Sequence, residues 1–222
     1  MRVGKGSDRK NDRSAAIGGK AAILWLAIFF AVLLWSAIRP HDYFTWFMEV
    51  FPAVVAFIVL AATYTRFRFS ALAYWLILAH AVILMVGGHY TYAEVPLFDR
   101  VRDLFHQGRN NYDKVGHFAQ GFVPAIIARE LLLRKLPLRA GAWLSFIAVS
   151  ICLAFSALYE LFEWAVAEAT GEAAEAFLGT QGYQWDTQSD MAFALLGAVL
   201  AVVLLGRYHD VQISRSTDKA EN

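Results

Sequence analysis

Residues 70–89 read SALAYWLILAHAVILMVGGH and contain no Asp, Glu, Lys or Arg. An α-helix needs about 20 such residues to cross the hydrocarbon core of a bilayer. Further apolar stretches occupy residues 21–38, 50–64, 114–133, 141–164 and 188–206. The chain is 58% hydrophobic and its mean hydropathy is +0.43, which is too apolar for a typical soluble domain. The sequence therefore predicts an all-α polytopic membrane protein with about six transmembrane helices.

The composition divides the chain into three parts. Residues 1–20 are basic and polar and predict a disordered cytoplasmic tail, residues 21–206 form the six-span domain, and residues 207–222 form a polar cytoplasmic C-terminal tail that is expected to fray. A signal peptide is the alternative reading of the N-terminus. The run at 21–38 is longer than a typical signal core and has no clear cleavage site after it, so we expect a retained span. The stretch at 50–64 is short, which predicts a tilted span with Pro52 in its first turn.

The distribution of Lys and Arg predicts the orientation of the spans. Basic residues crowd the N-terminal tail, the connections that follow the second and fourth stretches, and the C-terminal tail. With six spans these four segments share one side, which the positive-inside rule assigns to the cytoplasm. Both termini are therefore predicted to be cytoplasmic. The connection from Tyr90 to Asn111 is an exception because it carries both charges, and its segment VPLFDRVRDLFHQ is amphipathic enough to lie along the interface.

With this topology, three helix ends bring ionisable residues to the extracytoplasmic face. Charged groups inside a membrane are costly, so they usually face the protein interior and often mark a functional site. The spacings of three and four residues place the members of each pair on one helix face. The six residues are Asp113 and His117, Glu160 and Glu163, and Asp186 and Asp190.

The residue types indicate two kinds of chemistry. One imidazole with several carboxylates suits Mg²⁺, Mn²⁺ or Ca²⁺, and also Zn²⁺ with an open position, so His117, Glu160 and Asp190 are candidate metal ligands. The same residues, with Glu163 and Asp113 in support, are candidate catalytic acids and bases. A structural interpretation stands beside this one: Asp113 and Asp186 can be plain N-caps, Glu163 can face water, and the others can form a buried hydrogen-bonded network.

Several other polar or aromatic residues have simpler interpretations. His80 is expected to be a packed core histidine, and Lys114 to pair with an acid or reach the interface. Gly87 and Gly88 indicate a close-packed or flexible span end, where a ligand role for His89 is the less favoured reading. Tyr183 and Trp185 stand beside Asp186 and are candidates for a lid over the site.

Four segments resemble one known family. They are GGHYTYAEVPLFD, YDKVGHFAQGFVPAIIARELLLR, ALYELFEW and GTQGYQWDTQSDM, and they occur in the same order as in the YjdF-type bacterial inner-membrane proteins, whose activity is not settled. The resemblance runs from about Phe47 to Gly206. VanZ-like membrane proteins are a more distant likeness. They share the pattern of Asp113, Lys114, His117, Phe118, Glu160 and Asp190, but they often carry Asn where this chain has Ala194.

These observations predict a polar site that is open to the extracytoplasmic face. The leading hypothesis is a metal-assisted or acid–base enzyme that acts on a lipid-linked or cell-envelope substrate, with a divalent ion as a candidate cofactor. The alternatives are a transporter or proton-coupled carrier, and a non-catalytic scaffold. A carrier needs polar residues at mid-depth and in the cytoplasmic half, and these look sparse here. We expect membrane lipids, and not nucleic acid, as partners.

Overall fold

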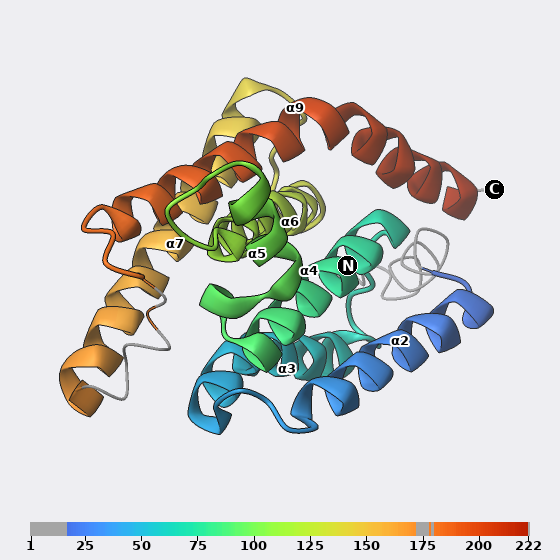
Figure 1. The fold of residues 1–222 in the computed structure, drawn as a ribbon. Helices are drawn as coiled ribbons and strands as arrows, with labels where there is room; N and C mark the ends of the chain where they lie inside the picture. The colour runs from blue at the N-terminus through green and yellow to red at the C-terminus, as the bar shows by residue number, and fades with distance from the viewer. Residues whose placement is uncertain (1–16, 172–177, 179, 222) are drawn as a thin grey trace.

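A computed structural model describes residues 17–171, 178 and 180–221, and the described residues form helices without strands (Figure 1). The predicted N-terminal tail lies almost entirely outside these residues. The long helices are α2 (Gly19–Ala37), α3 (Tyr43–Thr63), α4 (Ala71–Tyr90), α6 (Tyr112–Lys135), α7 (Ala142–Thr170) and α9 (Asp186–Glu221). A short 3₁₀ turn, η1 (Tyr92–Glu94), and a short helix, α5 (Pro96–Leu104), connect α4 to α6.

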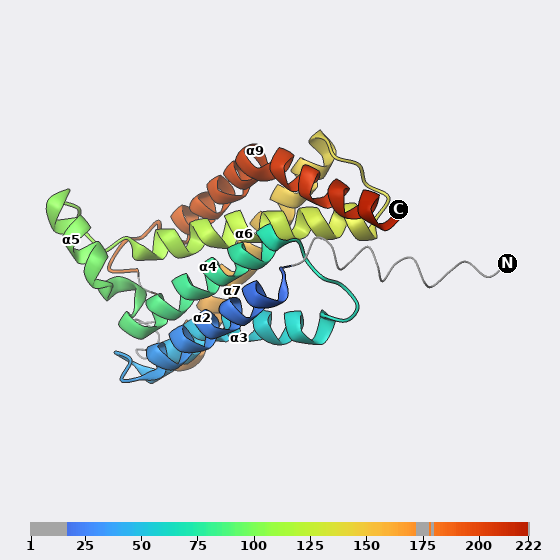
Figure 2. The same ribbon diagram turned by 90° about the vertical axis from the view of Figure 1, so that its right-hand side faces the viewer.

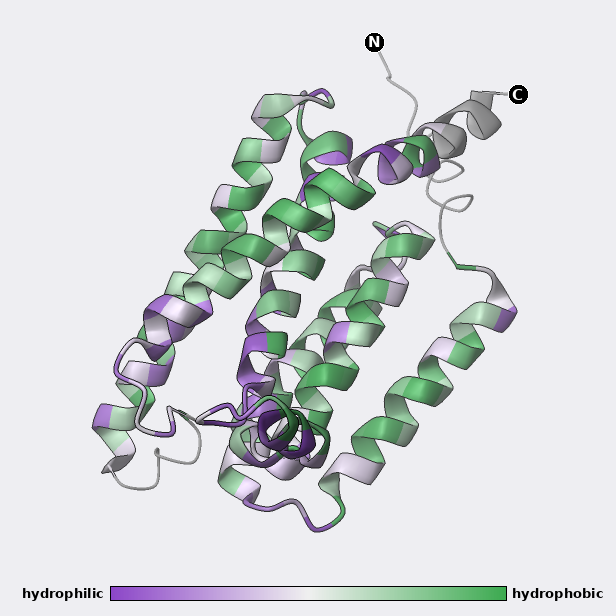
Figure 3. Cartoon of the chain, turned by 45° about the horizontal axis from the view of Figure 1, so that its top comes forward, coloured by the Kyte–Doolittle hydropathy of each residue, from purple (hydrophilic) through white to green (hydrophobic). Residues whose placement is uncertain are grey.

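The polytopic all-α fold is confirmed. Five of the described helices, namely α2, α3, α4, α7 and α9, are long and apolar enough to cross a membrane. The sixth long helix, α6, carries more charged residues and packs against α9, α7 and α4. A helix surrounded in this way can hold polar side chains away from lipid. Hydrophobic residues cover most of the long helices, and hydrophilic residues are concentrated near the two ends of the bundle (Figure 3).

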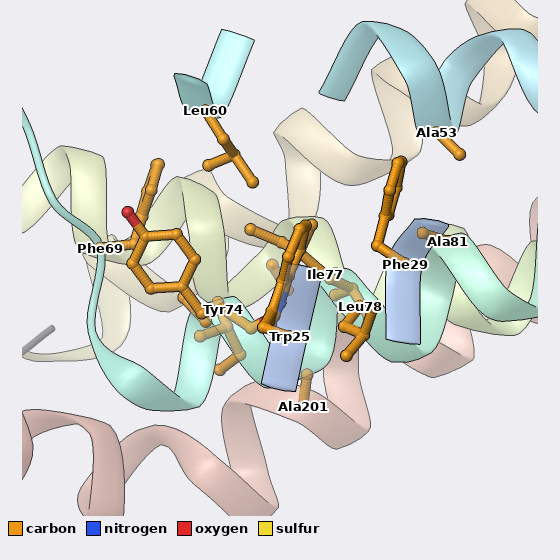
Figure 4. Packing of buried hydrophobic residues seen from close by; sticks show 14 of the residues in the cluster. Trp25, Phe29, Ala53, Leu60, Phe69, Tyr74, Ile77, Leu78, Ala81 and Ala201 are labelled. Carbon is orange, nitrogen blue, oxygen red and sulfur yellow. The ribbon is translucent and has the colours of Figure 1, made fainter. Parts of the chain in front are cut away.

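The apolar core lies where α2, α3 and α4 meet α6 and α9 (Figure 4). The ring of Trp25 stacks on Phe29 with centroids 5.4 Å apart, and Phe29 stacks on Phe57 at 4.9 Å. The indole Nε1 of Trp25 donates to the backbone oxygen of Tyr74 at 2.8 Å, so its polar atom is also satisfied. These contacts pack α2 and α3 against α4. Charged residues are more frequent on α6 and at the ends of α9.

Two glycines bring α6 and α9 unusually close together. A Cβ atom added at Gly121 would lie 1.7 Å from the backbone oxygen of Ala194, and one added at Gly197 would lie 2.1 Å from the backbone oxygen of Phe118. Small residues at such a crossing allow two backbones to touch, as is common between membrane helices. This contact holds the middle of α6 tightly on α9.

Three helix boundaries differ from those expected from the sequence. Helix α3 begins at Tyr43 and not near residue 50, so the second span is not short and Pro52 lies inside the helix. It begins early because Asp42 caps it: Oδ2 of Asp42 accepts from the backbone N of Thr45 at 2.6 Å, and this bond lowers the pKa of the carboxyl. The sixth span was predicted to end at 206, but α9 continues as helix to Glu221. Helix α2 starts at Gly19.

The bundle has two distinct ends. Helix α5 projects at one end, and the C-terminal part of α9 lies at the other (Figure 2). We call these the α5 end and the α9-tail end. The candidate site residues stand at the beginning of α6, in the last third of α7 and at the beginning of α9, all towards the α5 end.

Candidate functional site

A buried ion network joins the beginnings of α6 and α9. The ammonium Nζ of Lys114 lies 2.6 Å from Oδ1 of Asp186, 2.7 Å from Oδ1 of Asp190 and 3.2 Å from Oδ2 of Asp113. All four side chains are more than nine-tenths buried. The three carboxylates lie close enough together to hold a metal ion, but the lysine ammonium already occupies the space between them. Asp113 and Asp186 are therefore members of an ion network and not simple N-caps.

Arg109 extends this network into the connection between α5 and α6. Its guanidinium contacts Asp113, and Nη1 donates to Oδ1 of Asp186 at 2.6 Å and to the backbone oxygen of Thr180 at 3.1 Å. Nearby, the backbone N of Asn110 donates to Oε1 of Gln181 at 3.1 Å. This connection was an exception to the orientation rule because it carries both charges. For Arg109 the structure gives a local cause, since this residue neutralises acids of α6 and α9.

A second group, formed by His117, Glu160 and Asp190, lies directly beside the ion network. Nδ1 of His117 is 3.7 Å from Oε1 of Glu160, and Nε2 is 3.6 Å from Oδ1 of Asp190. One ligand atom from each residue lies within 4.8 Å of the others. The side chain of Glu160 is only 6% exposed, and its buried Oε1 accepts no hydrogen bond from the described residues. A buried carboxylate oxygen without a donor is costly, and an ion or a water between these atoms would satisfy it.

A cavity of about 90 Å³ opens from this group into the bundle. Its wall includes Glu163 from α7, which is buried and does not face water. It also includes Glu49 from α3, a site residue that the sequence interpretation missed. The wall consists of Glu49, Pro52, His80, Leu84, Tyr92, Asp113, Gly116, His117, Gln120, Tyr159, Glu163, Leu178 and Asp190. A cavity this small, with several carboxyl and imidazole groups in its wall, suits an ion with its waters more than an organic molecule.

The ring of Tyr92 closes one side of this cavity, and two glycines make room for it. A Cβ atom at Gly87 would lie 2.2 Å from Cε2 of Tyr92, and one at Gly116 would lie 2.7 Å from Cε1. The span end at Gly87 and Gly88 is therefore close-packed, one of the two readings expected from the sequence. The neighbouring His89 is tied to α2, since its Nδ1 lies 3.0 Å from the backbone oxygen of Ser36 and its ring is 4.5 Å from that of Trp35.

A larger pocket of about 600 Å³ lies on the outer side of the ion network. Its residues come from α5, α6, α9 and their connections: Phe98, Gln107, Arg109, Asn111, Lys114, Val115, Phe118, Tyr183, Ser189 and Phe193. The ring centroid of Tyr183 is 5.8 Å from Cζ of Arg109 and 5.9 Å from Nζ of Lys114. Tyr183 thus lies beside the network; the side chains of Tyr183 and Trp185 are both exposed, and their role as a lid stays a prediction.

Six carboxyl groups consequently gather near two cationic side chains at the α5 end. The acids are Glu49, Asp113, Glu160, Glu163, Asp186 and Asp190, and the cations are Arg109 and Lys114. The carboxyl groups thus outnumber the cationic side chains, and such a surplus of carboxyl oxygens favours the binding of a cation. Glu49 could have been found from the sequence, because it is a single acid within the apolar run TWFMEVF.

A second buried polar cluster, at the α9-tail end, was not expected. Oε1 of Glu130 accepts from the backbone N of Ser70 at 2.8 Å and from Nη1 of Arg134 at 2.6 Å, and Oε2 lies 3.1 Å from Nε2 of His209. Glu130 and His209 are fully buried. The adjacent residues Arg129 and Asp210 make a bidentate contact at 2.6 and 2.9 Å. The expectation that polar residues are sparse in this half was wrong: Arg129 and Glu130 lie within the apolar stretch at 114–133, and His209 and Asp210 lie where α9 continues beyond the stretch at 188–206.

These features define a class: a polytopic helical membrane protein with charged clusters buried at both ends of its bundle. The family described as "Predicted membrane protein (DUF2238)" matches residues 21–211, and the chain belongs to this family. The Inner membrane protein YjdF of Escherichia coli (strain K12) is 50% identical to it over 184 residues, which are 83% of this chain and 88% of that protein. No solved structure matches. The chain is therefore an integral inner-membrane protein of the YjdF type.

Proposed function

We propose that the group of His117, Glu160 and Asp190 binds a divalent ion and forms the catalytic site of an enzyme that acts on a lipid-linked or cell-envelope substrate. His117 and Glu160 serve as ligand or base, and Asp190, Glu163 and Asp113 support them. The observation that carries this proposal is Oε1 of Glu160, which is buried without a hydrogen-bond donor and faces the imidazole of His117. One nitrogen and two carboxylate oxygens form a set that suits Zn²⁺ with an open position, or Mg²⁺ and Mn²⁺ with waters.

The same proposal places the site at the extracytoplasmic face, with both termini in the cytoplasm. Its support is the clustering of basic residues at the α9-tail end, where the connections from α3 to α4 and from α6 to α7 contain Arg66, Arg68 and Arg139. Of the arginines at the α5 end, Arg102 pairs with Asp99 and Arg109 with Asp113. A substrate carried by lipid would reach the site from the outer leaflet.

Two features favour an enzyme over a carrier or a scaffold. The helices α6 and α9 touch at Gly121 and Gly197, between the two charged clusters, and the intervening side chains of Val123 and Ile126 are buried and apolar. Asp113 and Glu130 are 17 residues apart, or about 25 Å along a helix, so a solute would need a path through this packed region. For a purely structural network, the donor-less oxygen of Glu160 is an unfavourable arrangement.

Metal analysis of the detergent-purified full-length protein tests the proposal. We expect about one Zn²⁺, Mn²⁺ or Mg²⁺ per chain and a melting temperature that falls on chelation and recovers when the ion is restored. The variant Glu160→Gln should lose both effects. Glu94→Gln is the matched control, because Glu94 lies at the same end but is exposed and pairs only with His41 among the contacts described. Metal-free wild-type protein with no ion-dependent shift would overturn the proposal.

A further inference from the structure

The ion network divides two spaces of opposite charge. The larger pocket on its outer side, here called the surface pocket, is lined by the cations Arg109 and Lys114, and its described lining has no carboxylate. The inner cavity is lined by Glu49, Asp113, Glu163 and Asp190, and its described lining has no Lys or Arg. The network thus presents the side chains of Arg109 and Lys114 to the surface pocket and carboxylates to the inner cavity, while the Nη atoms of Arg109 and Nζ of Lys114 also bind the carboxylates.

The wall of the surface pocket opposite the cations is apolar. Phe98 belongs to α5, Val115 and Phe118 to α6, and Phe193 to α9. Phe98 is held by an edge contact with Tyr112 at 5.2 Å, and Phe118 stacks on Phe122 at 5.5 Å, so both rings have fixed positions. An apolar wall with a few convergent polar groups is the usual form of a small-molecule site.

The surface pocket also lies where a membrane lipid would be present. Helix α5 is amphipathic, and its exposed Leu97 and Leu104 are 65% and 72% accessible. A short helix of this kind lies in the interface plane, with its apolar side towards the acyl chains. Phe193 on α9 is 38% exposed, so the apolar wall reaches the lipid-facing surface of the bundle.

We infer that the surface pocket binds a phosphate-bearing lipid. Its apolar chain lies against Phe98, Phe118 and Phe193, and its phosphate lies at the cationic side formed by Arg109 and Lys114. This inference rests on the proposed function, because it names the substrate class of that site. The phosphate and a divalent ion would then lie on opposite sides of the network, with Oδ1 of Asp190 approached by both Lys114 and His117.

Lipid binding to the full-length protein in detergent tests the inference. It can be measured with short-chain lipids by native mass spectrometry and calorimetry. The probes are dioctanoyl phosphatidate, dioctanoylglycerol, which has the chains without the phosphate, and inorganic phosphate, which has no chains. We expect phosphatidate to bind at least about tenfold more tightly than either of the others, since each half of the pocket contributes. Equal binding of dioctanoylglycerol, or full affinity for inorganic phosphate alone, would overturn the inference.

Substitutions in the apolar wall locate the bound lipid. Phe193→Ala removes part of the wall and should weaken phosphatidate binding about tenfold, and Val115→Phe should fill the pocket and weaken it at least as much. Phe155→Ala is the matched control, because Phe155 on α7 is 61% exposed and lies outside the pocket. Melting temperatures identify any variant that fails to fold. Unchanged affinity in both folded wall variants would contradict a lipid at this place.

The two proposals can fail separately. If Glu160→Gln and chelated wild-type protein still bind phosphatidate with pocket-dependent affinity, and the wild type binds no metal, then the lipid site stands and the metal-assisted mechanism fails. If the protein binds its ion but shows no preference for phosphatidate, then the metal site stands and the lipid inference fails.

Discussion

The ammonium Nζ of Lys114 lies 2.7 Å from Oδ1 of Asp190, the same oxygen that approaches Nε2 of His117 at 3.6 Å. One carboxylate oxygen thus serves both the ion network and the candidate metal group. A metal ion that bound Asp190 through this oxygen would compete with Lys114 for it. Ion binding in the candidate metal group is therefore coupled to the ion network. A substitution at Lys114 or Asp190 should change both the stability of the network and the affinity for a metal ion.

Removing the ammonium should be strongly destabilising. In Lys114→Met, Asp113, Asp186 and Asp190 lose their shared cation while remaining buried, and we expect a loss of about 3–5 kcal/mol of unfolding free energy. Adding Asp190→Asn should restore part of this loss, because one uncompensated charge is removed. Equilibrium unfolding in detergent measures both variants. A double variant no more stable than Lys114→Met would contradict the coupling between these residues.

Neutralising Glu130 and neutralising Glu160 should have opposite effects on the stability of the protein. Glu130 accepts hydrogen bonds from Ser70 and Arg134, so Glu130→Gln weakens satisfied contacts and should cost about 1–3 kcal/mol. Glu160 stands among like charges with one oxygen lacking a donor, so Glu160→Gln should leave stability equal or higher in metal-free protein. Thermal unfolding of the two variants without divalent ions provides the comparison. A large loss of stability in Glu160→Gln would favour a structural network.

The crossing of α6 and α9 should not tolerate even one added methyl group. Gly121→Ala and Gly197→Ala place a Cβ against backbone oxygen atoms that cannot move without separating the helices, and we expect each to cost at least about 3 kcal/mol. Gly206→Ala is the matched control on α9, because the nearest atom to its Cβ is 3.8 Å away. Melting temperatures of the three variants should separate them clearly. A Gly121→Ala protein as stable as Gly206→Ala would contradict this close approach.

Cysteine accessibility tests the proposed orientation. The single native cysteine, Cys152, is fully buried and should give little background with a membrane-impermeant maleimide. Trp185→Cys at the α5 end should react in intact cells, whereas Ser214→Cys at the α9-tail end should react only after the membrane is opened. Reaction of both from the same side would refute the orientation and the extracytoplasmic placement of the site.

The N-cap of α3 gives a prediction for pH. The bond from the backbone N of Thr45 lowers the pKa of Asp42 below its ordinary value of 3.8. A lowered pKa in the folded protein means that the stabilisation is present above 3.8 and is lost as the pH falls through the folded value. Wild type should therefore exceed Asp42→Asn by about 0.5 kcal/mol near neutral pH and lose this advantage in acid. The unfolding free energies of wild type and Asp42→Asn, measured across the acidic pH range, test this prediction. A difference between them that does not change with pH would contradict it.

The six long helices among the described residues could be predicted from the sequence, five of them because hydropathy is a property of contiguous residues. The stretch at 70–89 became α4 at Ala71–Tyr90, and the stretch at 141–164 became the beginning and middle of α7. Boundaries set by polar residues were harder. The cap at Asp42 and the polar continuation of α9 depend on hydrogen bonds and tertiary contacts that hydropathy does not contain.

The candidate site could be predicted only in part. Helix spacing and topology placed His117, Glu160 and Asp190 at one end, and the structure brings the three together, while their role as a site stays a prediction. The partners of the acids were not predictable. Arg109 reaches Asp186 across 77 positions of the chain, and although Glu49 stands out as a single acid in an apolar run, its position beside the other acids depends on the packing of α3. Such pairings depend on how helices are arranged around α6, which no local pattern encodes.

The composition of α6 has a consequence for biosynthesis. This helix is not apolar enough to be counted among the candidate spans, and Lys114, Arg129 and Glu130 each have a partner on α9. Because α9 leaves the ribosome after α6, these charges have no α9 partners while α6 is being made. We therefore expect α6 to enter the membrane late, together with α9, and a chain truncated before Asp186 to be recognised by quality-control proteases.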